Sequence, residues 1–178
     1  GHADAFNVIK AAFLSIGEAD FRVFGDIGCY TLGHEIPYEC IHTVVAMGAS
    51  IGMALGAAYA GHKPSACVIG DSTFFHSGIH PLLSVIKSNV NVNVFIFDNG
   101  TTAMTGQQPT IFTQDVPKFI EGMGMDKKYI HTLIPLPQKH DDNVKALVEI
   151  LNHNGPDVII FKRECVQTVK TRASQKSN

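Results

Sequence analysis

The chain has 178 residues, of which 45% are hydrophobic and 17% are charged, and its formal net charge is -2. This length suits one globular domain, and the weakly negative charge lacks the basic character of nucleic-acid-binding proteins. Four irregularly spaced cysteines and a start without a signal-like segment argue against a secreted disulfide scaffold. We expect a single domain over residues 1–178, in the cytoplasm, with no nucleic-acid partner.

Helix and strand patterns alternate along the chain. Helices are predicted over residues 5–16, 44–60, 116–123 and 142–152, with one more beginning near Pro81. Strands are predicted over residues 21–25, 65–69, 92–97, 129–134 and 157–162. Asp141 is the expected N-cap of the helix over residues 142–152, and the polar tail over residues 168–178 is expected to fray. The alternation predicts an α/β fold with a mostly parallel sheet and helices on both faces.

The uncharged segment over residues 44–61 has a second interpretation. It is long enough to approach a membrane span, and Gly48, Gly52 and Gly56 form a small-residue pattern. It is rich in Gly and Ala rather than Leu or Ile, however, and it lies within the α/β alternation. We therefore expect no membrane partner, and instead a helix buried against the sheet that a ligand or partner backbone approaches closely.

Two acidic turns point to a magnesium site. Asp71 follows the apolar strand over residues 65–69, and Asn99 follows the strand over residues 92–97. The 28 positions between them match one strand–helix–strand unit, which places both turns at the carboxyl edge of a parallel sheet. Asp71, the side-chain carbonyl of Asn99 and the backbone carbonyl of Thr101 could bind Mg²⁺. Gly70 leaves room for a phosphate, and free amides after Ser72 add a positive helix end.

Each of these turns also fits a second kind of structure. Asn99-Gly100 is a hairpin signal as well, although the nearly continuous apolar run before it favours a strand buried on both faces. Gly-Asp-Ser also occurs in GDSL-type hydrolases, where Ser72 would be the nucleophile. Such hydrolases commonly carry an Asp-x-x-His sequence, which is absent here.

The nine histidines do not form a zinc motif. His34-Glu35 is followed by Tyr38 where a zinc protease needs histidine. His76 and His80 are four residues apart, but the helix start expected between or after them removes their shared face. His76 is predicted to lie in the loop above the diphosphate, where it could hydrogen-bond substrate or cofactor as a catalytic residue, or serve the structure only.

Four motifs in order resemble the thiamine diphosphate enzymes and, more narrowly, the 2-oxoacid:ferredoxin oxidoreductases, nearest the indolepyruvate type. They are GDIGCYTLG at residues 25–33, MGASIG at 47–52, IGDSTFFHSGI at 69–79 and DNGTTAMTGQQP at 98–109. The resemblance implies the three-layer thiamine diphosphate-binding fold, with Mg²⁺ as a second cofactor. It places Met47 as the apolar wedge that holds the cofactor bent. The implied cofactor-binding residues are Gly28, Cys29, Met47, Gly48, Gly70, Asp71, Ser72, Asn99, Thr101 and Met104.

The same resemblance implies oxidative decarboxylation of a 2-oxo acid to acyl-CoA, with ferredoxin as electron acceptor. Phe74, Phe75 and Phe112 could line a pocket for an aryl pyruvate such as indolepyruvate, or simply pack in the core. Thiamine enzymes also need a glutamate from a pyrimidine-binding domain, for which these residues hold no candidate segment. We therefore expect a subunit or excised domain within a homo- or hetero-oligomer. Another thiamine-dependent decarboxylase or synthase, or a non-catalytic thiamine-fold module, are the alternatives.

The cysteines suggest an iron-sulfur cluster. Ferredoxin-coupled relatives hold one through a Cys-x-x-Cys before a Gly-His, a Gly-Cys turn and a cysteine after a late strand. Gly1-His2, Cys29 and Cys165 match parts of that pattern. A cluster is therefore expected only in a chain extended upstream, because two of the four thiolates are missing here. In the simpler interpretation Gly1-His2 is a cloning remnant and all four thiols are structural, as Cys40 and Cys67 are expected to be in either case.

Overall fold

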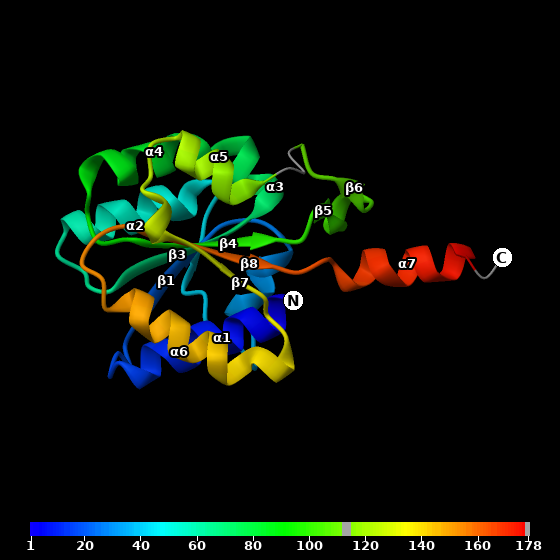
Figure 1. Ribbon diagram of the computed structural model, residues 1–178, viewed down its shortest axis with the longest axis horizontal. Coiled ribbons are helices and arrows are strands. Elements are labelled where there is room, and N and C mark those ends of the chain that lie inside the picture. Colours follow the sequence, from blue (N-terminus) through cyan, green and yellow to red (C-terminus); the bar gives the residue numbers. More distant parts are fainter. Residues whose placement is uncertain (112–114, 177–178) are drawn as a thin grey trace.

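Within residues 1–111 and 115–176, the part of the chain that the computed structural model describes, six parallel strands form the central sheet. Their order is β2-β1-β3-β4-β8-β7, and every neighbouring pair is parallel. Helices α1 and α6 cover one face, and α2, α4 and α5 cover the other (Figure 1). The predicted three-layer α/β fold is therefore confirmed.

The sheet strands and the longer helices alternate as expected. The sheet consists of β1 (Arg22–Gly25), β2 (Thr43–Val44), β3 (Ser65–Gly70), β4 (Asn93–Asp98), β7 (Ile130–Leu133) and β8 (Asp157–Lys162). The α-helices are α1 (His2–Ser15), α2 (Ala49–Tyr59), α3 (Asp71–Thr73), α4 (Ile79–Ser88), α5 (Val116–Gly122), α6 (His140–Leu151) and α7 (Val166–Lys176). A small hairpin pairs β5 (Thr101–Thr102) with β6 (Gln108–Pro109). Shorter helical turns are η1 (Cys29–His34), η2 (Phe74–Gly78), η3 (Ala103–Thr105), η4 (Lys127–Tyr129) and η5 (Pro137–Lys139).

The central strands are apolar throughout because both faces of the sheet are covered. All six residues of β3 are buried. In β4, Phe95 and Phe97 contribute to the core beneath α1 and α6, whereas Val94 and Ile96 contribute to the core beneath α2, α4 and α5. A strand covered on both sides has no solvent face, so its sequence does not alternate with polar residues.

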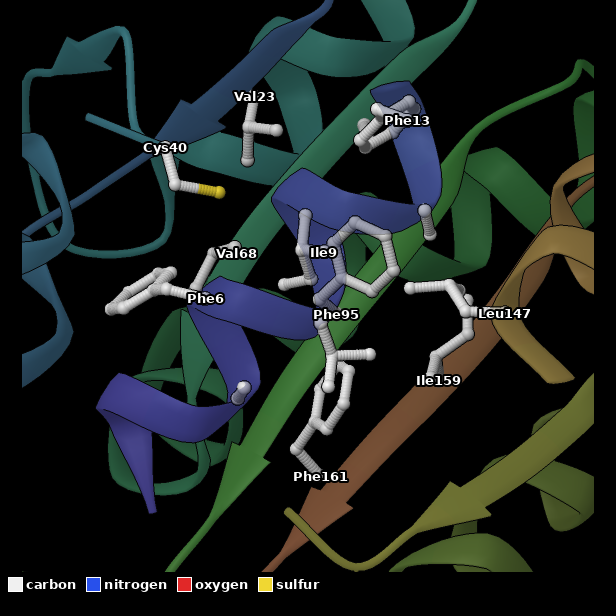
Figure 2. Close-up of a cluster of buried hydrophobic side chains, with 14 of the residues drawn as sticks. Phe6, Ile9, Phe13, Val23, Cys40, Val68, Phe95, Leu147, Ile159 and Phe161 are labelled. Carbon is white, nitrogen blue, oxygen red and sulfur yellow. The ribbon is translucent and has the colours of Figure 1, made fainter. Parts of the chain in front are cut away.

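Aromatic packing fills the layer between α1 and the sheet (Figure 2). The ring of Phe13 stacks on Phe21 with centroids 4.8 Å apart and meets Phe95 edge-on at 6.4 Å. Phe95 in turn lies 6.1 Å from Phe161 on β8. These contacts join α1 to strands from both halves of the sheet.

The helix after β3 begins earlier than the sequence suggested. Helical backbone starts directly at Asp71 and continues through the π-helical η2 turn into α4. A helix does begin near Pro81, because α4 starts at Ile79 and Pro81 is its third residue, but helical backbone is already present from Asp71. Proline lacks the N–H for a bond four residues back, and here it follows a turn that already departs from α-helical geometry.

The helix predicted over residues 44–60 is shorter than expected. It begins at Ala49, because Thr43 and Val44 form β2 and Gly48 adopts a left-handed backbone with φ +83°. Gly52 and Gly56 are exposed, with no other atom of the described chain within 4 Å of an added Cβ. No helix among the described residues has the length and apolar character needed to cross a membrane.

The start of α6 and the structure of the C-terminal tail also differ from the sequence prediction. Helix α6 begins at His140 with Lys139 as N-cap, so Asp141 lies in the first turn and is not the cap. There its carboxylate still favours the helix, because acidic groups complement the positive N-terminal end. The tail expected to fray from residue 168 continues as α7 up to Lys176, which extends away from the sheet (Figure 1).

The packing of α1 can be tested with two adjacent residues of this helix. Phe13 is fully buried, whereas the Leu14 side chain is 51% exposed. We expect Phe13→Ala to lower the free energy of unfolding by about 3–5 kcal/mol, and Leu14→Ala by about 0.5 kcal/mol or less. Urea unfolding followed by circular dichroism measures both, and equal effects would contradict this packing of α1 against the sheet.

Candidate cofactor site

Three turns meet at the carboxyl edge of the sheet because β1, β3 and β4 are neighbours there. Phe24 of β1 pairs with Cys67 of β3, and Gly70 at the end of β3 pairs with Phe97 of β4. The segments that follow these three strands therefore leave the sheet side by side. Crevices at this edge are where open parallel sheets bind ligands.

The carboxylate of Asp71 joins two of these turns. Its Oδ2 accepts the backbone N–H groups of Asn99 at 3.2 Å and Gly100 at 2.8 Å, and its Oδ1 accepts the N–H of Ser72 at 2.7 Å. Burial raises the pKa of Asp71 to about 6, although these hydrogen bonds oppose the rise. A carboxylate has about four acceptor sites, so one remains for a cation. This donor set fits Mg²⁺, which binds oxygen ligands.

The side chain of Asn99 is held from two sides. Its Oδ1 accepts the N–H of Thr101 at 3.0 Å, and its Nδ2 lies 3.4 Å from Nε2 of His2. Burial lowers the pKa of His2 to about 4, so Nε2 of the neutral ring can accept a hydrogen bond from this amide. The second lone pair of Oδ1 stays available for a ligand.

A cavity of about 210 Å³ lies over these groups. Its walls are more apolar than polar, which is typical of sites that bind organic cofactors. Met47 reaches it from the turn before α2, as the wedge interpretation requires. The predicted site residues that line it are Gly28, Cys29, Met47, Gly70, Asp71, Ser72, Asn99, Thr101 and Met104.

Three predicted site residues do not line this cavity, namely His76, Gly48 and the cluster candidate Cys165. His76 is exposed in η2, on the continuous helical run that replaces the expected loop. Gly48 lies behind Met47, where a Cβ would collide with Ser77. The Ser77 hydroxyl donates to the Met47 carbonyl at 3.2 Å, so Gly48 and Ser77 shape the turn that carries Met47.

Sequence reasoning missed three residues of the site. Tyr30 and His2 line the cavity, and Asp26 is fully buried and accepts the Tyr30 hydroxyl. An added Cβ at Gly28 or Gly70 would meet the Tyr30 ring, at 2.6 Å for Gly70. Asp26 directly follows a strand, as Asp71 does, and that shared position was the signal that could have revealed it.

The hairpin and hydrolase interpretations of the two turns gain little from the geometry. The strand β4 pairs in parallel with β3 and β8, so the Asn99-Gly100 turn does not close a hairpin with it. The hydroxyl of Ser72 lies 2.6 Å from that of Thr102. Ser72 therefore bonds to another alcohol, whereas a nucleophilic serine needs a base.

The aromatic residues proposed for a substrate pocket have other positions. Phe74 is fully buried in the core beneath α2, α4 and α5, and Phe75 packs edge-on against Phe119 with centroids 5.2 Å apart. Phe112 lies outside the described residues. Phe74 and Phe75 thus serve packing, which is the second of the two roles considered for them.

Cys29 and Cys165 share one electrostatic environment. Burial raises the pKa of the Cys29 thiol, a hydrogen bond with the Met104 backbone opposes this, and the neighbouring Cys165 raises it further. Cys40 and Cys67 are fully buried instead. The described residues hold no group of three or more His, Cys, Asp or Glu side chains placed to bind one metal ion.

These features define a class of protein: an α/β domain that binds an anionic organic cofactor at the carboxyl edge of its sheet. The family model for the thiamine pyrophosphate enzyme, C-terminal TPP binding domain, matches residues 26–161. The chain belongs to this family, and the match confirms thiamine diphosphate as the cofactor of the family.

Curated relatives give the comparison more detail. The chain is 32% identical to indolepyruvate oxidoreductase subunit IorA of Archaeoglobus fulgidus, over 92% of this chain and 27% of that protein. It is 42% identical to the subunit of the same name from Thermococcus kodakarensis, over 79% of this chain and 25% of that protein. The chain thus spans about a quarter of the length of these relatives.

A solved structure supports the fold. It is the 2-oxoglutarate:ferredoxin oxidoreductase from Magnetococcus marinus with 2-oxoglutarate, coenzyme A and succinyl-CoA bound, superposed with a TM-score of 0.77 at 18% identity. The match covers 93% of this chain and 62% of that chain. At this identity the likeness concerns the arrangement of helices and strands.

The floor of the cavity can be tested with two glycines. Gly70 has an ordinary extended backbone, so the obstacle to a side chain there is the buried Tyr30 ring. We expect Gly70→Ala to lower the free energy of unfolding by about 1–3 kcal/mol. Gly52→Ala adds a methyl in open space within α2 and should raise it by about 0.5–1 kcal/mol. Chemical denaturation of both variants measures whether the two changes in the free energy of unfolding have opposite signs. An unchanged free energy of unfolding in Gly70→Ala would contradict the contact between Gly70 and the Tyr30 ring.

Proposed function

We propose that this chain is the thiamine diphosphate-binding part of an oxidoreductase that oxidatively decarboxylates a 2-oxo acid. Coenzyme A would take the acyl group, and ferredoxin the electrons. The observation that carries the proposal is the Asp71 carboxylate, held between two strand ends beneath an apolar-walled cavity that Met47 enters. The names of the relatives support an aryl pyruvate such as indolepyruvate as substrate.

The two acidic turns would bind the diphosphate in two ways, through Mg²⁺ ligands and through backbone amides. Asp71, the side-chain carbonyl of Asn99 and the backbone carbonyl of Thr101 would hold Mg²⁺, which keeps its other positions for phosphate and water. The helix that starts after Gly70 would direct the positive end of its peptide dipoles to the same anion, although the Ser72 amide already donates to Asp71. When bound, thiamine diphosphate supplies a nucleophilic carbon and an electron sink for the decarboxylated product.

Met47 would act on the shape of the cofactor. It is 47% exposed and lines the cavity. The Ser77 hydroxyl donates to its backbone carbonyl, which helps to place the residue, and its apolar side chain would brace the ligand. Bracing of this kind lowers the entropy lost in reaching a reactive geometry.

The proposal includes a partner that covers the cavity. Exposed apolar side chains occur on the segments that follow β1, β2 and β4, and clustered apolar surface marks interaction sites. A pyrimidine-binding domain or subunit fits this edge, because it would add the glutamate that the reaction requires. We place the assembled oligomer in the cytoplasm. The exposed residues are Leu32, Ile36, Val45, Met47 and Met104.

Cys29 and Cys165 would contribute two thiolates to an iron-sulfur cluster beside this cavity. Cys29 lines the cavity, which suits electron transfer from the cofactor, and Cys165 follows the carboxyl end of β8 in the same parallel sheet. A four-iron cluster needs two more thiolates, which would come from residues preceding Gly1.

Cofactor binding tests the proposal directly. We expect calorimetric titration with thiamine diphosphate and Mg²⁺, in the presence of the pyrimidine-domain partner, to show binding that weakens at least about 100-fold in Asp71→Ala and Asn99→Ala, since each removes an oxygen ligand. Asp142→Ala and Asn152→Ala are matched controls, because they make the same changes at exposed positions in α6 and at its end, outside the cavity lining.

Three results would redirect the assignment. Absence of binding by the unsubstituted chain together with its partner would favour a non-catalytic thiamine-fold module. Hydrolysis of p-nitrophenyl esters that disappears in Ser72→Ala would favour the hydrolase. Asp71→Ala that binds magnesium and cofactor normally would show that the ion is held elsewhere.

The cluster has its own test. In a chain extended upstream and prepared without oxygen, we expect iron and acid-labile sulfide near four per chain, with both lost in Cys29→Ser and in Cys165→Ser. Cys40→Ser is the control, because Cys40 is buried in the core away from the cavity. Iron-free protein, or iron that persists in both cavity-side variants, would retire the cluster.

A further inference from the structure

We propose that Asp26 is a positioning residue that holds the Met47-Gly48 turn and the Tyr30 ring at the walls of the cavity. The side chain does not line the cavity itself and acts through its neighbours. The inference rests on the proposed function only in that the cavity receives thiamine diphosphate and magnesium.

One carboxylate joins three segments of the chain. Oδ1 of Asp26 accepts the hydroxyl of Tyr30 in η1, while Oδ2 accepts the N–H of Gly48 at 3.0 Å and the hydroxyl of Ser50 in α2 at 2.8 Å. Asp26 itself follows β1. The end of β1 is thereby tied to η1 and to the turn before α2, two of the segments that line the cavity.

The setting of Asp26 is unusual for a residue that serves stability alone. It has 0% exposure, and no Lys, Arg or His of the described chain forms an ion pair with it. Burial raises its pKa, and the three hydrogen-bonding partners counter that rise. Apolar packing often stabilises a fold as well as a buried charge does, so a retained charge points to a geometric requirement.

Each hydrogen bond of Asp26 fixes something at the cavity wall. The Tyr30 ring covers Gly28 and Gly70, and its hydroxyl bond to Asp26 sets the plane of that ring. The Gly48 bond holds the residue after Met47. The Met47 carbonyl belongs to the same peptide group and accepts from Ser77, so the Met47–Gly48 peptide is held by a hydrogen bond at its N–H and another at its C=O.

Hydrogen exchange tests the clamp without any cofactor. In the 178-residue chain, we expect Asp26→Ala to speed exchange of the Gly48 amide by about 30-fold, because a charge-assisted hydrogen bond is lost. Amides of β8 should keep their protection. Phe13→Ala is the control, because it weakens the core beneath α1 and α6 without touching Asp26. The Gly48 amide should exchange more slowly in Phe13→Ala than in Asp26→Ala. Unchanged Gly48 exchange in Asp26→Ala would overturn the proposal.

Titration calorimetry then tests the consequence for binding. We expect Asp26→Ala to weaken binding of thiamine diphosphate with Mg²⁺ at least about 10-fold at a temperature where the protein stays folded, with less than about 3-fold for Phe13→Ala. Asp26→Asn should restore most of the affinity, because the amide oxygen still accepts from Gly48 and Ser50 and its nitrogen can donate to the Tyr30 oxygen.

The two measurements separate two failures. If the unsubstituted chain binds no cofactor, the proposed function fails, while exchange at Gly48 still decides whether Asp26 holds the turn. If the unsubstituted chain binds and Asp26→Ala binds equally well, the positioning role of Asp26 fails and the proposed function stands. An equal loss of affinity in Phe13→Ala would also overturn it, since that loss would reflect general destabilisation.

Discussion

The hydrogen bonds from Asn99 and Gly100 to the Asp71 carboxylate are the interaction on which the site depends. They tie the end of β3 to the end of β4 and bring together two turns that are distant in the sequence. Without them, only the hydrogen bond from the neighbouring Ser72 amide would orient the carboxylate. With them, the side chain has one acceptor site left and a fixed direction for it. The cavity above is organised around that direction.

The order of the strands explains why three turns, and not two, build the site. Because β3 lies between β1 and β4, the segment after β1 joins the two acidic turns. The continuous apolar runs of β3 and β4 and the spacing of Asp71 and Asn99 predicted this arrangement, since parallel strands covered on both faces need such sequences. Met47 was placed by resemblance of its motif, and it lies in the cavity wall. The sheet and the central residues of the site were therefore accessible from local patterns.

The errors arose where tertiary contacts override local signals. Ser77-Gly78 and Pro81 are typical of a helix boundary, but helical backbone runs through them, with the π-helical η2 turn directly before α4 and Pro81 in the first turn of α4. That continuity places His76 on an exposed helical surface instead of in a loop over the diphosphate. Asp26 was missed for a related reason. Its role depends in part on Gly48 and Ser50, which lie in another motif, and no spacing within GDIGCYTLG points to those two donors.

The raised pKa of Asp71 couples the stability of the fold to the binding of a cation at this carboxylate. Burial raises its pKa from 3.8 to about 6, so the folded protein binds more protons than the unfolded chain between these values. Stability contributed at this residue therefore falls as the pH rises through that window, by an amount on the order of 3 kcal/mol, and stays low at neutral pH. A divalent cation at the remaining acceptor site favours the charged carboxylate and reverses that penalty. By linkage, the free energy lost in burying Asp71 without a cation is part of what the bound ion restores, so occupancy should stabilise the two turns together.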